Sequence, residues 1–118
     1  MSARMQLIDS HVNLHAEAFA EDREAVIGRA FAAGVWPLLT ICDRLAHVPD
    51  VLAIADAHAS IFASVGAHPH HAKDRPDLSV EELIALARHP KVAAIGETGL
   101  DRHYNYSPEP EQRRSLMT

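Results

Sequence analysis

The chain has 118 residues, and 47% of them are apolar, which is too large a share for an intrinsically disordered segment. This length suits one domain with a modest core, or one half of a larger barrel. The formal net charge of -5 argues against a broad basic surface that grips nucleic acid through its phosphates. A nucleic-acid substrate would therefore need a local cation.

Cysteine content and hydropathy indicate the compartment. Cys42 is the only cysteine, so the chain can form neither an internal disulfide nor a zinc site with four thiolates. The first residues show no long apolar run behind basic residues, and no window approaches the length of a membrane span. We expect a cytoplasmic protein that makes no contact with a membrane.

Apolar spacing predicts strands that alternate with helices along the chain. Short apolar runs predict strands at residues 5–8, 36–42, 61–65 and 92–96, and the run at 36–42 suits a strand covered on both faces. Helical spacing predicts helices at 19–33, 49–58 and 80–87, and the start of a barely formed fourth helix at 107–111. Ser79 and Glu82 form a capping box, and Gly34 and Pro90 are helix stops.

This order of elements predicts an α/β protein with a parallel sheet, because parallel neighbours need crossover helices. The expected strand starts at residues 5, 36, 61 and 92 lie 25 to 31 residues apart, which suits a TIM-type barrel or a doubly wound sheet. A full barrel takes eight such units and about 250 residues. Four units are recognisable, so we expect residues 1–118 to form one partial (β/α) barrel domain.

Polar side chains follow each expected strand at its carboxyl end, where parallel α/β proteins gather their reactive groups. The first strand leads into Asp9, His11, Asn13 and His15, which alternate and are expected to share one face. An alternative interpretation of this stretch is a helix cap or a polar turn. The other three strands lead into the groups Thr40, Cys42 and Asp43, then His68, His70 and His71, and finally Glu97. We expect a shared metal or acid–base site on this rim.

Several other polar residues have simpler interpretations. His58 and His89 lie at helix ends, where they suit the last carbonyl groups, and His47 is expected to be a solvated loop side chain. Cys42 is expected to be a small buried hydrophobe. Asp101 either holds a turn or orients a ligand through a hydrogen bond.

Three segments, LIDSHVNLH, IFASVGAHPHHA and HPKVAAIGETGLDRHYNYSPEPEQRR, together resemble the amino-terminal half of the TatD family of metal-dependent hydrolases. The resemblance implies a TIM-like barrel that binds one or two divalent ions (Mg, Mn or Zn) and hydrolyses phosphodiesters, including the ends of DNA. It also implies that His11 and Glu97 are metal ligands and that His68 contacts the substrate or the attacking water. His70 is expected to act beside His68.

The sequence departs from the family at two positions and in length. Asn13 stands where the family carries a second histidine ligand. We expect Asn13 to be a metal ligand with His11 and Glu97, although an amide oxygen is a poorer ligand for a transition metal than imidazole. His15 stands where the family usually has an aspartate. The family's later ligands belong to a second half that these residues do not include. Either two copies pair, or another chain completes the barrel, or this is a truncated relative.

Two functions remain open on the sequence alone. The first is hydrolysis of a phosphodiester by a metal-activated water, with His68 and His70 acting on the phosphate or the leaving group. The alternative is a non-catalytic half-barrel that serves as a metal-binding or protein-interaction module, consistent with Asn13 and the missing half.

Overall fold

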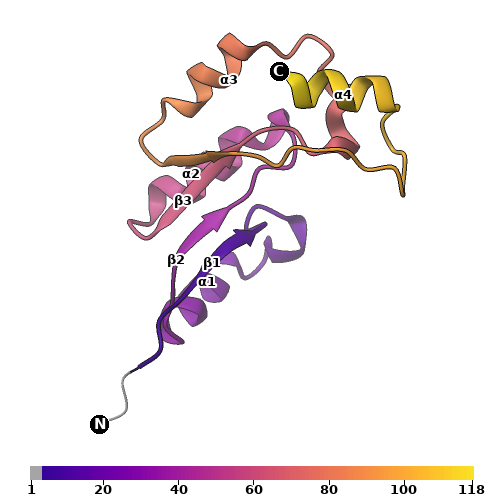
Figure 1. The fold of residues 1–118 in the computed structure, drawn as a ribbon. Helices are drawn as coiled ribbons and strands as arrows, with labels where there is room; N and C mark the ends of the chain where they lie inside the picture. Colours follow the sequence, from indigo (N-terminus) through magenta and orange to yellow (C-terminus); the bar gives the residue numbers. More distant parts are fainter. Residues whose placement is uncertain (1–3) are drawn as a thin grey trace.

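The computed structural model describes residues 4–118 as a parallel sheet whose strands are joined by helices (Figure 1). The strands are β1 (Leu7–Val12), β2 (Val35–Thr40), β3 (Ile61–Val65) and β4 (Val92–Ile95), and they pair in that order. The helices are α1 (Arg23–Ala32), α2 (Val48–Ala57), α3 (Val80–Ala87) and α4 (Glu109–Met117). Short 3-10 helices occupy Glu17–Phe19 (η1), Leu45–His47 (η2) and Pro69–Asp74 (η3). The expected α/β partial barrel is confirmed.

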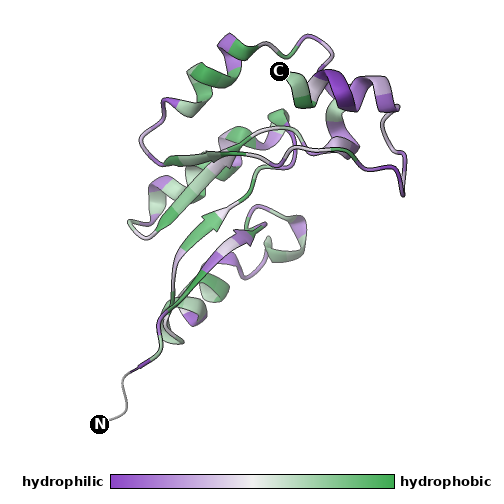
Figure 2. Ribbon diagram, in the orientation of Figure 1, coloured by the Kyte–Doolittle hydropathy of each residue, from purple (hydrophilic) through white to green (hydrophobic). Residues whose placement is uncertain are grey.

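The core lies between the sheet and the helices that cross over it. Ile27 of α1 and Val51 of α2 are fully buried against Leu38, Ile61 and other residues of the central strands. Figure 2 shows much of β2 and β3 in green, the colour of hydrophobic residues. Full burial of each such side chain contributes about 1.5–3 kcal/mol. Within residues 4–118, no helix is long and apolar enough to cross a bilayer.

The opposite face of the sheet is covered less completely than expected. Ile8 on β1 is 67% exposed, and Ile95 on β4 is 53% exposed. Leu39 and Phe62 line a shallow apolar hollow on this face. The described helices pack on one side of the sheet. The prediction that strand 36–42 is covered on both faces is therefore correct only for the face that the helices cover.

Several element boundaries differ from the sequence prediction by one or two residues, and two larger differences have identifiable reasons. β1 runs to Val12 rather than ending at residue 8, because its main chain continues to pair with β2 through Asp9 and Val12. Residues 19–33 do not form one helix, since η1 and a turn precede α1, which begins at Arg23. The expected fragment of a fourth helix is a full element, α4, which packs against η3. The Ser79 cap is confirmed by a 3.1 Å hydrogen bond from the Glu82 amide.

A hydrogen-bonded junction joins the carboxyl ends of β2, β3 and β4. The buried Ser64 hydroxyl donates to the Gly96 carbonyl at 2.7 Å and accepts from the Cys42 amide at 3.0 Å. The Glu97 amide donates to the Cys42 carbonyl at 2.9 Å. Cys42 is fully buried, as expected, and burial raises the pKa of its thiol. These bonds fix where Glu97 leaves the sheet.

Gly66 lies against this junction and has no room for a side chain. A Cβ atom built at Gly66 would come within 2.7 Å of the Gly96 carbonyl carbon, a backbone atom that has little freedom to move. We predict that Gly66→Ala lowers the free energy of unfolding by about 1–3 kcal/mol through overpacking. Urea denaturation followed by circular dichroism measures this loss.

Gly28→Ala is the matched control for this substitution. Gly28 lies within α1, and a Cβ atom there meets nothing within 4 Å. Alanine is the better helix former, so this variant should gain about 0.5–1 kcal/mol. Equal stability of the two variants would contradict the crowding described at Gly66.

Candidate metal centre

His11, His68 and Glu97 converge at the carboxyl edge of the sheet. His11 lies in β1, His68 caps η3 directly after β3, and Glu97 follows β4. The Nε2 atom of His11 lies 3.4 Å from Oε2 of Glu97, and Nε2 of His68 lies 3.3 Å from Oε1. The structure thus brings together His11 and Glu97, which are 86 positions apart in the sequence.

The spacing of these groups suits a metal ion. Ligand atoms that bind one tetrahedral ion with bonds of roughly 2.0–2.1 Å are separated by roughly 3.3 Å. The distance between His11 and Glu97 has this value rather than that of a short hydrogen bond. The His11 side chain is 55% exposed, so the position between the two groups is open to solvent. An imidazole and a carboxylate are ligand types that zinc and manganese accept.

The protonation of His68 follows from its partners. Its Nδ1 atom accepts a hydrogen bond from the His70 amide at 3.0 Å, so the neutral ring carries its proton on Nε2. That N–H faces Glu97. His68 is therefore arranged to donate a hydrogen bond at the mouth of the sheet, either to Glu97 or to a bound anion.

His70 is held by Asp101, and Asp101 is held by a loop that α4 fixes. Nε2 of His70 is hydrogen-bonded to the Asp101 carboxylate. The amides of His103 and Tyr104 donate to the other carboxylate oxygen, and the buried Gln112 side chain bonds both backbone groups of Asp101. Asp101 thus both holds a turn and orients an imidazole. The role of Gln112 has no signal in the sequence, because its contacts depend on how α4 docks.

Asn13 is hydrogen-bonded to the main chain beyond the neighbouring strand β2. Its amide nitrogen donates to the Ile41 carbonyl at 3.3 Å, and its side chain lines a different pocket. Asp9 accepts a hydrogen bond from the His11 amide at 3.0 Å. The polar residues after the first strand divide into two groups, since Asn13 and His15 line one pocket whereas His11 faces Glu97.

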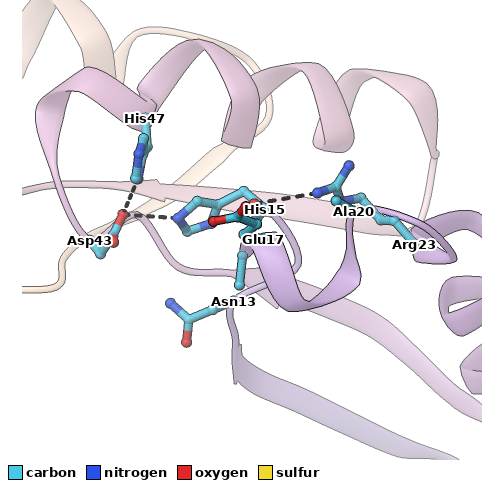
Figure 3. Close-up of a pocket in the computed structure, with 8 residues that line it drawn as sticks. Asn13, His15, Glu17, Ala20, Arg23, Asp43 and His47 are labelled. Carbon is cyan, nitrogen blue, oxygen red and sulfur yellow. Dashed lines mark hydrogen bonds and ion pairs between the residues drawn. The ribbon is translucent and has the colours of Figure 1, made fainter.

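A second group of potential ligands consists of His15, Asp43 and His47 (Figure 3). Nε2 of His15 and Nδ1 of His47 lie 2.9 and 2.8 Å from Oδ1 of Asp43. Partial burial raises the pKa of Asp43, but hydrogen bonds from His47 and His15 outweigh it, and the net pKa is lowered. The prediction that His47 is a solvated loop residue is wrong. The sequence did contain a signal for this contact, because Asp43 and His47 are four residues apart just before a helix.

The fold and the site together define a class of protein. It is a partial parallel (β/α) barrel with imidazole and carboxylate side chains clustered at the carboxyl ends of its strands. The sequence model of the TatD related DNase family matches residues 8–118. The chain belongs to this family.

Individual relatives agree with this assignment. The chain is 38% identical over 111 residues to the 3'-5' ssDNA/RNA exonuclease TatD of Salmonella typhimurium, covering 94% of this chain and 43% of that protein. It is 37% identical over 111 residues to the protein of the same name from Escherichia coli K12, with the same coverage. The crystal structure of YjjV, a TatD homolog from Escherichia coli K12, superimposes with a TM-score of 0.82 at 33% identity, covering 94% of this chain and 44% of that one.

The His70–Asp101 contact makes a testable contribution to acid stability. The hydrogen bond from His70, together with the His103 and Tyr104 amides, lowers the pKa of Asp101. A lowered folded-state pKa means that the stabilisation is complete above the unfolded carboxyl pKa of about 3.9 and is lost as the pH falls through the folded value. We predict that Asp101→Asn makes the free energy of unfolding less dependent on pH in this acid window. Urea denaturation at several acid pH values gives the slope, and an unchanged slope would contradict the contact.

Proposed function

We propose that His11 and Glu97 of this chain hold a divalent metal ion in a hydrolase that cleaves phosphodiester bonds of single-stranded nucleic acid. The observation that carries the proposal is the convergence of His11, His68 and Glu97 from three strand ends. The Nε2 atom of each histidine lies within 3.4 Å of a carboxylate oxygen of Glu97. Membership of a metal-dependent family supports it, as do relatives that are named as exonucleases of single-stranded DNA and RNA. The candidate ions are Mg, Mn and Zn, and the site is proposed to bind either one ion or two.

The residues of the chain divide the work as follows. A bound divalent ion would lower the pKa of water toward about 7 and so provide hydroxide at neutral pH. Glu97 and His11 hold the ion, and the Ser64 junction fixes the position of Glu97. His68, with its proton on Nε2, donates to a non-bridging phosphate oxygen. His70 is hydrogen-bonded to Asp101 and lies against His68, with ring centroids 4.2 Å apart, and these contacts support a role for His70 at the leaving group.

A pair of stacked tyrosines supports a nucleic-acid substrate. The rings of Tyr104 and Tyr106 are nearly parallel, with an interplanar angle of 3° and centroids 5.4 Å apart, and both side chains are more than half exposed. Both rings contact His70 edge-on, so the aromatic surface adjoins the site. Stacking of a base on an aromatic side chain contributes about 1–3 kcal/mol and tolerates any base.

The second candidate function is a non-catalytic metal-binding or protein-interaction module. The chain spans 43% of the length of the curated relatives that it matches. A catalytic metal centre normally has three protein ligands and an open position, whereas Asn13 is bonded to the Ile41 carbonyl and the His11–Glu97 pair supplies two. Under this alternative, a second copy or a complementing chain is the partner at the sheet edge.

Metal binding by His11 and Glu97 is tested by substitution. We predict that His11→Ala and Glu97→Ala each abolish the manganese content that belongs to this pair, because each removes half of the ligand set. His58→Ala is the matched control, since His58 contacts Glu24 on the helix side of the sheet. Elemental analysis after dialysis gives the manganese content, and equal content in all three variants would refute the assignment.

The two candidate functions differ in nuclease activity. The purified 118-residue chain is incubated with single-stranded DNA and Mg²⁺ or Mn²⁺, and released nucleotides are measured with and without a chelator. Metal-dependent release that is lost in Glu97→Ala supports the hydrolase. Metal binding without release supports the non-catalytic module.

A further inference from the structure

We propose that His15, Asp43 and His47 form a second metal site, which binds a divalent transition-metal ion, with zinc the best match. The site shares no side chain with the His11–Glu97–His68 group. It therefore stands independently of the proposed hydrolase. Two imidazoles and one carboxylate with free positions form a ligand set that zinc and similar transition metals accept, whereas magnesium and calcium prefer oxygen ligands.

The ligand atoms lie close to the positions that an ion requires. One potential ligand atom from each of His15, Asp43 and His47 lies within 4.8 Å of the other two. The two nitrogen–oxygen distances, 2.9 and 2.8 Å, are hydrogen-bond distances that must lengthen to roughly 3.3 Å around a tetrahedral ion. His47 is able to make this adjustment, because its side chain is 36% exposed and lies at the start of α2.

The hydrogen bonding of His15 is incomplete for a purely structural residue. Its side chain is only 5% exposed, and its Nδ1 atom is buried without a partner. Both imidazoles also converge on the same oxygen of Asp43. An unpaired buried polar atom costs about 1–3 kcal/mol, and proteins retain such features chiefly at functional sites. An ion bound through Nε2 of His15 would leave Nδ1 unpaired, so the feature that points to a cation is the convergence of both imidazoles on one carboxylate oxygen.

The surroundings of the cluster support binding of an ion that keeps exchangeable ligands. The three residues line a pocket of about 540 Å³ together with Asn13, Glu17 and Arg23 (Figure 3). Arg23 holds the loop in place by donating from Nε to the Leu14 carbonyl at 2.6 Å. The open side of the pocket leaves room for water or a small anionic ligand to complete the coordination sphere.

Zinc titration tests the site on a chain whose first site has been removed. The reference protein is the double variant His11→Gln and Glu97→Gln, which lacks the proposed catalytic ligands. We expect isothermal titration calorimetry to show one zinc ion bound to this reference. Adding His47→Gln should weaken zinc binding by more than about 100-fold, because loss of an outer-shell partner alone costs roughly 10- to 100-fold.

Controls separate loss of a ligand from loss of the fold. Asp43→Asn in the same reference should also weaken zinc binding, whereas His58→Gln should leave it unchanged, since His58 contacts Glu24. Circular dichroism checks the fold of each protein. Imidazole nitrogen spectra should show zinc shifting Nε2 of His15 and Nδ1 of His47.

The outcomes decide the proposal in either direction. It is overturned if the reference protein binds no zinc, if His47→Gln binds zinc as tightly as the reference, or if zinc shifts other histidine nitrogens. A failure here leaves the His11–Glu97 site untouched, because that site is tested by manganese content in variants with an intact His15 cluster.

Discussion

The arrangement at the mouth of the sheet depends on the Ser64 hydroxyl group. By donating to the Gly96 carbonyl and accepting from the Cys42 amide, Ser64 joins three neighbouring strands at the level where each one ends. The Glu97 amide adds a bond to Cys42, and the His68 amide donates to the Asp43 carbonyl at 2.7 Å. The main chain of Glu97 and of His68 is thus held by hydrogen bonds. This limits the conformational entropy that is lost when their side chains become ordered at the site.

The same backbone network connects the two clusters of the rim. Asp43 offers its carboxylate to His15 and His47, while its carbonyl accepts from the amide of His68, whose side chain faces Glu97. Neither cluster shares a side chain with the other, yet one residue contributes to the position of both. The two clusters lie near each other because the loops that follow all strands of a parallel sheet begin at the same edge.

Sequence reasoning succeeded where a residue's environment is set by nearby sequence. The strand β3 and the helix α3 were predicted with their observed bounds, since a compact apolar run and a Ser79 cap are local signals. That His11 and Glu97 come together also followed, because a parallel sheet fixes which strand ends meet. Reasoning failed at His15, where a strict two-residue alternation was assumed through an irregular strand and into a turn. It also failed at His47, which was expected to be solvated but contacts Asp43. Gln112 was beyond reach, because its three hydrogen bonds exist only after α4 docks.

The charge of the rim bears on whether an acidic chain could accept the anionic substrate proposed above. Each of its carboxylates lies against imidazole: Glu97 against His11 and His68, Asp43 against His15 and His47, and Asp101 against His70. A cation bound between such partners would add positive charge where a carboxylate and an imidazole already face each other. The formal charge of -5 is a property of the whole surface, whereas under the proposed function the field that a phosphate would meet is set by these few groups and the ion they would hold.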